Sequence, residues 1–251
     1  MNNLSGLKIL NVPVTPATVE NIFDYIDITI NYNAGPKMIG YVNLHGLYVS
    51  IKNISMHQYY SITAINYVDG TPVIWILKLM GHKVDINYRI TFLDFYLDFF
   101  KHCKQKEYRV LWLGGEQESL SKGITIIKRD ILGVIVHGVN GYKTDDEYLE
   151  EVKLFKPHII LLGFGMPKQE EWVLRNKDKI EVNIVWNVGA TIDFISGKAI
   201  TPPRWTGKFG IEWFFRFINE PKRMFFRYFC EPLIIVAQLI KGAIKKVSNC
   251  K

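Results

Sequence analysis

The chain has 251 residues, of which 48% are apolar, 22% charged and 14% aromatic. This composition excludes a disordered or low-complexity protein and supplies enough apolar residues for a sizeable core. Cys103, Cys230 and Cys250 lie far apart without a C-x-x-C pair, which excludes a disulfide framework and disfavours a structural zinc site. The N-terminus resembles no secretory signal, and no stretch reaches the roughly 18 apolar residues of a spanning helix. We therefore expect a cytosolic protein without a membrane span.

The net charge of +7 is confined to the last fifth of the chain. Residues 1–197 contain 20 Lys and Arg against 21 Asp and Glu, whereas residues 198–251 contain 11 against 3. The same segment is rich in Phe and Trp. Basic residues interleaved with large apolar ones indicate an anionic, partly apolar partner, and a membrane surface fits best. Nucleic-acid binding is the weaker alternative, because apolar runs at helical spacing suit a bilayer interface better than a phosphate groove.

Short apolar runs alternate with helix-length segments as far as residue 190. These runs are apolar throughout, which is typical of parallel strands covered on both faces. We therefore predict a Rossmann-like α/β fold, a mostly parallel sheet with helices on both faces, whose ligands lie beyond the carboxyl ends of the strands. Helices are expected over residues 145–155 and 168–179. The expected strands span residues 8–14, 37–43, 62–69, 108–115, 133–139, 158–164 and 182–189.

The strand pattern ends at Thr201, where the sequence TPPRW resembles a hinge because consecutive prolines interrupt regular structure. We predict two domains, a Rossmann-like catalytic α/β domain over residues 1–200 and a helical, basic, membrane-associating appendage over residues 201–251. A C-terminal helix that simply packs on the domain is the alternative, and the charge asymmetry favours the interfacial helices. The helical segments of the appendage are expected over residues 209–219, 221–229 and 232–247.

Polar residues follow two of the expected strands. In YVNLHG, Asn43 and His45 can hydrogen-bond a sugar or a phosphate, or Asn43 can cap the next helix. In YVDGTP, Gly70 allows a turn before a helix that begins near Pro72. The preceding Asp69 can cap that helix or serve as a general base for a hydroxyl nucleophile, and the spacing does not separate these roles.

Other candidate substrate-binding residues lie at further strand ends and loops. Arg89 is a fixed cation suited to a diphosphate or a carboxylate. Gly114 and Gly115 precede a helix whose N-terminus can bind phosphate, although a plain strand-to-helix turn is as consistent with the pattern. In GFGMPKQEEW, Gly165 ends a strand and Lys168 occupies the first turn of a helix. A lysine there opposes the helix dipole unless an anion is nearby, which suggests a ligand.

The motif WNVGATIDFISG also ends a strand with glycine. Its Asp193 can face the same crevice or cap a helix.

The chain resembles the WecG/TagA/CpsF glycosyltransferases, glycosyltransferase family 26. The resemblance is carried by YVNLHG, YVDGTPVIW, GFGMPKQEEW, VGATIDFISG and PPRW followed by GIEWFFRFINEPKRMFFRY. The resemblance runs in order from Leu7 to Tyr228, and five ordered motifs are far more specific than any one of them.

The resemblance implies an inverting transferase of bacterial envelope polysaccharide assembly. Such an enzyme moves a sugar, typically N-acetylmannosamine, its uronic acid or a related hexose, from a UDP donor to a sugar on undecaprenyl diphosphate. It works at the cytoplasmic membrane face, so we expect a cytoplasmic protein that is peripheral on the inner face of the membrane. The resemblance does not identify the donor sugar, because Asn43 and His45 stand where better-known members carry Thr and Asn.

Several residues acquire roles from this resemblance. Asp69 corresponds to the family's proposed catalytic base. Arg89 and Gln169 match substrate-contact positions, and Asn43 lies where many members carry Thr or Asn. The basic C-terminal segment resembles a membrane-targeting appendage. Its candidates for the lipid diphosphate are Arg216, Arg223 and Arg227.

No Asp-x-Asp motif ends a strand, so we expect no metal and no cofactor. Asp145 and Asp146 read as the first turn of a helix, and basic side chains with backbone N–H groups should stabilise the leaving group instead. The expected partners are a UDP-sugar, a polyprenyl-diphosphate-linked acceptor and the cytoplasmic membrane surface, without nucleic acid; homo-oligomerisation stays open. The main alternative is a non-catalytic peripheral membrane protein that binds a nucleotide sugar or anionic lipid. A nicotinamide-dependent oxidoreductase is disfavoured, because the glycine fingerprint is missing near the first strand.

Overall fold

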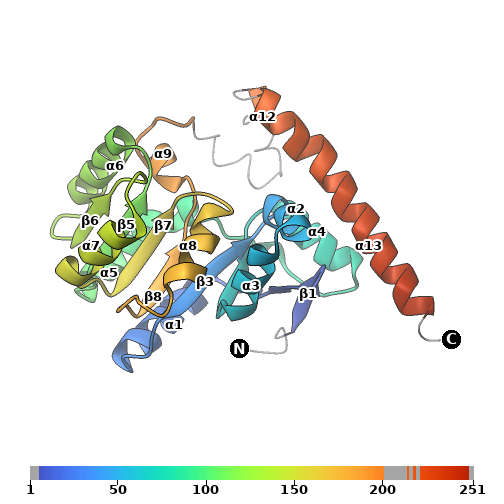
Figure 1. The fold of residues 1–251 in the computed structure, drawn as a ribbon, viewed down its shortest axis with the longest axis horizontal. Helices are drawn as coiled ribbons and strands as arrows, with labels where there is room; N and C mark the ends of the chain where they lie inside the picture. Colours follow the sequence, from blue (N-terminus) through green and yellow to red (C-terminus); the bar gives the residue numbers. More distant parts are fainter. Residues whose placement is uncertain (1–5, 201–213, 215–216, 219–220, 249–251) are drawn as a thin grey trace.

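A central sheet of six parallel strands organises the protein, and its strand order is β4-β3-β8-β7-β5-β6 (Figure 1). The computed structural model describes residues 6–200, 214, 217–218 and 221–248. Apart from the edge strand β6, the strands are largely buried, which explains their continuous apolar runs, and the sheet confirms the predicted α/β class. They are β3 (Lys37–Val42), β4 (Ile65–Val68), β5 (Val110–Gly114), β6 (Val136–Val139), β7 (Ile159–Gly163) and β8 (Ile184–Asn187).

The strand predicted over residues 8–14 is wrong. This segment forms an antiparallel hairpin, β1 (Leu7–Ile9) and β2 (Val12–Val14), which makes a separate two-stranded sheet. Leu10 and Asn11 between the two strands have φ of 50° and 66°. A two-residue turn with both residues left-handed matches the twist of a hairpin, and the apolar run conceals it because one of the two is a leucine.

Helices cover both faces of the sheet, as predicted. On one face α1, α5, α6 and α9 pack around Trp112 and Trp186, and on the other α2, α3, α4, α7 and α8 pack with the hairpin. The helices are α1 (Val19–Asn31), α2 (Leu44–Lys52), α3 (Ile54–Ile62), α4 (Thr71–Leu79), α5 (Phe92–Gln105), α6 (Gln117–Asp130), α7 (Asp145–Phe155), α8 (Lys168–Asn176) and α9 (Thr191–Ile195), with a short 3-10 helix, η1 (Ile86–Tyr88).

The strand order creates a crevice at the carboxyl edge of the sheet. β3 continues into α2 on one face, whereas its neighbour β8 continues into α9 on the other face. Adjacent strands whose connections leave in opposite directions open a gap above their carboxyl ends, where ligands of α/β proteins bind. The loops after β3, β4, β7 and β8 all reach this gap.

The C-terminal region is helical. The segments predicted over 221–229 and 232–247 form one uninterrupted series: α12 (Pro221–Phe225), a π-helical turn η2 (Phe226–Cys230) and α13 (Glu231–Ser248). Pro232 does not break this series; it lies in the first turn of α13, directly after the π-helical turn η2, where the hydrogen-bond register of the helix changes. The predicted hinge at TPPRW and most of the segment 209–219 lie outside the described residues.

The long helix α13 extends along one side of the molecule and packs on α2 (Figure 1). Ile235 belongs to the same buried cluster as the residues of α2 and α3. Within the part of the chain that the structure describes, no helix combines the length and the apolarity needed to cross a bilayer.

Candidate active site

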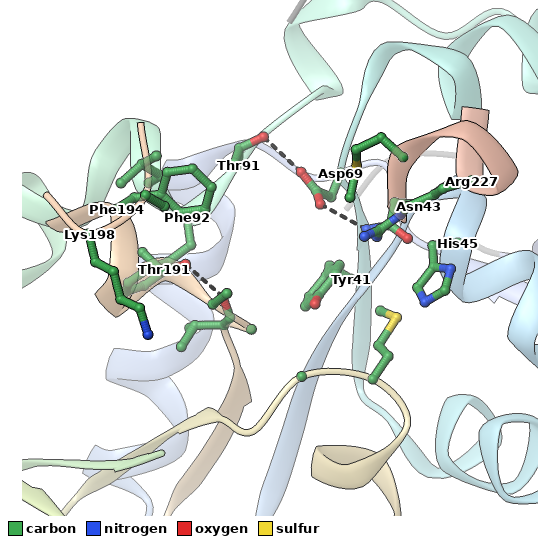
Figure 2. A pocket seen from close by; sticks show the side chains of 18 of the residues that line it. Tyr41, Asn43, His45, Asp69, Thr91, Phe92, Thr191, Phe194, Lys198 and Arg227 are labelled. Atoms are coloured by element: carbon green, nitrogen blue, oxygen red, sulfur yellow. Dashed lines mark hydrogen bonds between the residues drawn. The ribbon is translucent and has the colours of Figure 1, made fainter. Parts of the chain in front are cut away.

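Asp69 is the centre of a hydrogen-bonded set at the carboxyl edge of the sheet (Figure 2). The Thr91 hydroxyl donates to Asp69 Oδ1 at 2.7 Å, and the Asn43 amide donates to Asp69 Oδ2 at 3.2 Å. Each carboxylate oxygen is therefore held by one donor and keeps a lone pair for another. A carboxylate fixed in this way and partly exposed to a cavity has the geometry of a general base.

The register of two strands places Asn43 beside Asp69. Val42 pairs with Val68 in the parallel ladder, so the next residue of each strand emerges at the same level. Gly70, with φ of 102°, then turns the chain into α4. Asn43 also caps α2, because its Oδ1 accepts from the Gly46 N–H at 2.9 Å. Asn43 can therefore cap α2 and hold Asp69 at the same time, since its oxygen accepts from Gly46 and its amide nitrogen donates to Asp69.

Asp69 opens onto a cavity of about 530 Å³, which we call the main cavity. Its lining comes from the loops after β3, β4, β7 and β8, from residues 91–93 and from Met224 and Arg227 of the C-terminal helices. Figure 2 shows Asp69 and Asn43 on one side, Lys198 and Thr191 on the opposite side, and Tyr41 between them. The strand-end residues Asn43, His45 and Gly165, predicted to bind substrate, all line it.

A second cavity of about 550 Å³, the apolar cavity, adjoins the first between α4 and the C-terminal helices. Asp69, His45 and Arg227 line both cavities. The rest of its wall is largely apolar, with Trp75 and Leu79 among its residues. Asp69 therefore stands at the junction of a polar and an apolar cavity.

His45 connects this junction to α13. Its Nδ1 lies 2.9 Å and 3.1 Å from the two carboxylate oxygens of Glu231, which is 3% exposed. A buried carboxylate is stabilised only by such a partner, so this contact helps to fix where α13 meets the active site.

A third cavity of about 410 Å³, the glycine-loop cavity, lies on the other side of the loop 163–167. Gly115, Lys168 and Asp193 line it. The strand ends approach closely here: a Cβ at Gly114, whose φ is 121°, would lie 2.5 Å from the Gly163 carbonyl carbon. Gly114 is therefore required by the backbone, whereas Gly115 contributes to the cavity wall.

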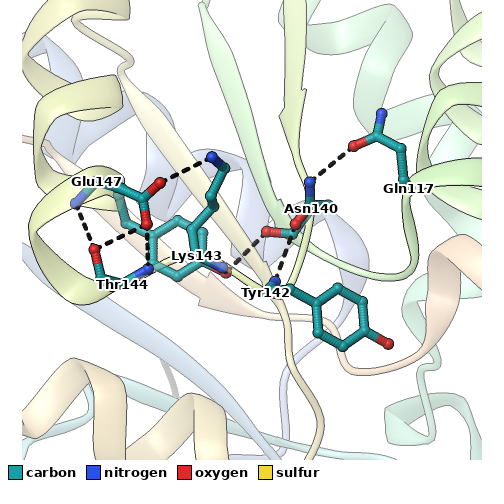
Figure 3. A network of polar contacts seen from close by, with 7 residues as sticks. Gln117, Asn140, Tyr142, Lys143, Thr144 and Glu147 are labelled. Atoms are coloured by element: carbon teal, nitrogen blue, oxygen red, sulfur yellow. Dashed lines mark hydrogen bonds and ion pairs between the residues drawn. The ribbon is translucent and has the colours of Figure 1, made fainter.

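A network of hydrogen bonds holds the loop after β6 (Figure 3), and residues of this loop line the glycine-loop cavity. Asn140 Oδ1 accepts from the Tyr142 N–H at 3.0 Å, and Asn140 Nδ2 donates to Gln117 at 2.8 Å. Thr144 and Glu147 then form a capping box at the start of α7. These bonds hold Tyr142, which is 77% exposed, at the edge of the cavity as a flat aromatic surface.

Two predicted substrate contacts lie away from the cavity surfaces. Arg89, the residue directly after η1, does not line any of the three cavities; its guanidinium lies 3.5 Å from Asp94. Gln169 is fully buried and donates to the Tyr41 hydroxyl at 3.4 Å, so it reaches the main cavity through Tyr41. Arg216 lies outside the described residues, and so does the side chain of Arg223.

Three residues of the candidate site were missed from the sequence: Thr91, Tyr41 and Glu231. Thr91 follows Arg89 in the motif NYRIT, and the bridge between Arg89 and Val68 brings it to Asp69. Tyr41 lies two residues before Asn43, on the same face of β3, so strand periodicity was the available indication. Glu231 lies 186 residues from its partner His45, and no local pattern marks it.

The residues Asp145 and Asp146 lie in the first turn of α7, as predicted. Asp145 accepts hydrogen bonds from Arg175 at 2.9 Å and from Asn176 at 3.0 Å. These donors hold the pKa of the Asp145 carboxyl below its usual range. Among the described residues, no three His, Cys, Asp or Glu side chains gather as metal ligands.

Comparison with known proteins places this site in context. Residues 7–249 match the profile of the glycosyl transferase WecG/TagA/CpsF family. The chain belongs to this family. The match covers nearly the whole sequence, including the residues of the C-terminal helices, so this family member is a glycosyltransferase.

Curated relatives of this family member include enzymes from Staphylococcus aureus strains MW2 and NCTC 8325. Each is 25% identical to this chain over 234 residues, which cover 89% of this chain and 88% of the relative. Both are named N-acetylglucosaminyldiphosphoundecaprenol N-acetyl-beta-D-mannosaminyltransferase. The alignment spans both the sheet and the C-terminal region.

Proposed function

We propose that this glycosyltransferase moves a hexose from a UDP-sugar to a sugar carried on undecaprenyl diphosphate, with inversion, in the synthesis of a bacterial envelope polysaccharide. N-acetylmannosamine, its uronic acid or a related hexose is the proposed donor sugar. The relatives' names support the proposed acceptor, because they describe enzymes that act on N-acetylglucosaminyldiphosphoundecaprenol. The enzyme works as a peripheral protein on the inner face of the cell membrane.

The position of Asp69 is the observation that carries this proposal. Its carboxylate lies where the main cavity meets the apolar cavity, and Arg227 lies at the same junction. A lipid-linked sugar has the same sequence of chemical parts: a polar sugar, an anionic diphosphate and an apolar chain. A hydroxyl of the acceptor sugar at Asp69 would leave its diphosphate near Arg227 and its lipid toward α4 and α13.

In the transfer step, Asp69 takes the proton of the acceptor hydroxyl. That oxygen forms a bond to the anomeric carbon of the donor sugar, and the bond from this carbon to the UDP oxygen breaks. The electron pair leaves with UDP. Thr91 and Asn43 hold the carboxylate oriented throughout, so that no reorganisation is needed when the proton moves.

The donor nucleotide fits the glycine-loop cavity. Lys168 in the first turn of α8 offers a cation beside the helix N-terminus, which favours a diphosphate. Tyr142 offers an exposed ring on which a base can stack. Gly163 and Phe164 line this cavity while Gly165 and Met166 line the main cavity, so a UDP-sugar would extend past this loop toward Asp69.

The test uses a short-chain lipid-linked N-acetylglucosamine diphosphate and a panel of UDP-sugars. We expect release of UDP and a product heavier by one sugar with at least one donor. Binding of a UDP-sugar without any turnover across the panel would contradict the proposal and favour the non-catalytic nucleotide-sugar binder. Detection of UDP separates the two outcomes directly.

A further inference from the structure

Tyr41 forms part of the floor of the main cavity, between the Asp69 side and the Lys198 side (Figure 2). Its position is tightly constrained from above. A Cβ at Gly189, at the end of β8, would lie 2.8 Å from the Tyr41 hydroxyl oxygen. The backbone of this loop therefore passes directly over the phenol, and the ring has little freedom to move.

Three fully buried polar side chains are joined by hydrogen bonds next to Tyr41, and one of them, Gln169, contacts its hydroxyl; we call Gln169, Glu170 and Asn187 the buried polar cluster. Gln169 Nε2 lies 3.4 Å from the Tyr41 hydroxyl and 2.8 Å from Glu170 Oε1. Asn187 Nδ2 donates to the same Glu170 oxygen at 3.0 Å. The Gln169 amide nitrogen therefore faces both the Glu170 carboxylate and the Tyr41 hydroxyl.

Burying three polar side chains is unfavourable unless hydrogen bonds compensate for their loss of water. The core beside them is built from apolar and aromatic side chains. None of the described residues donates to Glu170 Oε2. The cluster is therefore poorly explained by stability, and its contact with a cavity-lining hydroxyl provides the alternative explanation.

The phenol is a neutral donor toward the cavity. Burial, with the nearby carboxylates of Glu170 and Asp69, raises the pKa of Tyr41 well above its usual range, so it keeps its proton. Its oxygen accepts from Gln169, which leaves its own O–H to donate. An acceptor atom in the main cavity is the available partner.

We propose that Tyr41 is a specificity-determining residue whose hydroxyl donates to an oxygen of the transferred sugar, and that Glu170 positions it through Gln169. This inference rests on the proposed function. The transferred sugar is the relevant ligand because Tyr41 lies between Asp69, which faces the acceptor hydroxyl, and the loop 163–167, beyond which the nucleotide is placed. The contact is to the sugar and not to the nucleotide.

The test compares Tyr41→Phe with Tyr60→Phe. Tyr60 is the control: it is a buried tyrosine whose hydroxyl donates to the Tyr41 backbone carbonyl at 3.2 Å without lining any of the three cavities. The dissociation constants of UDP and of the UDP-sugar found active are measured by calorimetry. We expect Tyr41→Phe to weaken the UDP-sugar about tenfold and to leave UDP unchanged. Tyr60→Phe should change neither.

Equal UDP-sugar affinity in Tyr41→Phe and wild type would overturn the inference. So would an equal loss for UDP alone, because the contact would then be to the nucleotide. If the wild-type protein binds no UDP-sugar, the proposed function fails first. If wild type binds and transfers while Tyr41→Phe matches it in both, only this inference fails.

The positioning role of Glu170 has its own readout, the pH dependence of UDP-sugar affinity. Tyr41 faces Glu170 from β3, Tyr59 and Tyr60 face it from α3, and Glu171 lies on its own helix. Burial raises the pKa of Glu170 to about 7, and its ionised form accepts more strongly from Gln169. We expect wild-type affinity to rise between about pH 6 and pH 8 and the rise to be absent in Glu170→Gln. An identical rise in both proteins would contradict this role.

Discussion

The sheet of the α/β domain and the C-terminal helices differ in how far their apolar side chains are covered. In the sheet, apolar residues are covered on both faces by helices. Along η2 and α13, large apolar side chains stay exposed next to basic residues. They are Phe226, Phe229, Leu233, Val236, Ile240 and Ile244. Because contiguous exposed apolar surface is unfavourable in water, we infer that the C-terminal helices contact a further partner, whereas the strands of the sheet are covered within the chain.

The largest expected effect concerns the chemistry of the first region. Asp69→Asn keeps the shape of the side chain but cannot take a proton at neutral pH, so we expect turnover to fall by more than about 100-fold. UDP-sugar binding and the unfolding midpoint should change little. Asp98→Asn, at an exposed carboxylate paired with Lys101, is the control. Near wild-type turnover of Asp69→Asn would show that Asp69 is only a structural residue.

The next effect tests whether the second region contacts a membrane. Leu233→Ser with Ile240→Ser should weaken binding to anionic vesicles and reduce activity on the lipid-linked acceptor, because two apolar contacts with the bilayer are lost. Leu132→Ser with Leu154→Ser is the matched control, since Leu132 is 74% exposed and Leu233 71% exposed, but Leu132 lies in the α/β domain. Vesicle co-sedimentation measures the difference. Equal loss in both pairs would contradict a specific membrane surface on α13.

Truncation sharpens the same comparison. A chain ending at residue 200 should keep the α/β fold, because every strand of the sheet precedes that point, but should lose vesicle binding. The full chain should leave anionic vesicles only in part as salt rises, since salt screens the basic residues, at about 1 kcal/mol each, but not the apolar contacts. Vesicle binding by the shortened chain equal to that of the full chain would assign the charge excess some other role.

A smaller expected effect concerns the folding stability of the α/β domain and tests whether the Glu170 carboxyl is shielded from water. Burial raises the pKa of Glu170 from 4.5 to about 7. The unfolded chain therefore loses this proton first, and folding stability falls as pH rises through that interval, by roughly 3 kcal/mol at most. Glu170→Gln lacks this penalty, so urea unfolding should show a larger gain over wild type at pH 8 than at pH 5. An equal gain at both pH values would mean that Glu170 is hydrated.

The smallest expected effect is that of chelation. The sequence carries no Asp-x-Asp motif at a strand end, and we expect Lys168, Arg227 and backbone N–H groups to stabilise the leaving group and the lipid diphosphate. Activity should survive EDTA, and added magnesium or manganese should alter it only modestly. Complete loss in EDTA that manganese restores would overturn this prediction and direct attention to Asp193 beside the glycine-loop cavity.

The sequence was a good guide to this fold where a single physical rule dominates. Strands buried on both faces must be apolar throughout, so β3 to β8 could be predicted within a few residues. The hairpin at residues 7–14 could not, because its turn depends on two left-handed residues, and one of them is a leucine. Local sequence also accounts for the capping residue Thr144, the turn at Gly70 and the start of α8.

The residues of the candidate site also fall into two groups, those that the sequence predicted and those that it did not. Asp69, Asn43 and Gly165 could be predicted because polar residues after apolar strands converge at one edge of a parallel sheet. The placement of Gln169 behind Tyr41 could not, because whether a first-turn residue of α8 faces the cavity or the core depends on how the helix packs on the sheet. Glu231 was equally hidden, since its contact with His45 joins elements 186 residues apart.

What the sequence by itself determined is therefore the class of fold, the sheet edge that carries the site, the family motifs and the charge of the C-terminal region. These follow from period, composition and local turn chemistry, which act between near neighbours in the chain. Only the tertiary structure decided that Asp69 joins a polar and an apolar cavity, that Glu170 is buried beneath Tyr41, and that α13 meets the site through Glu231. Those features depend on strand register and helix packing, which bring distant residues together and which no local pattern encodes.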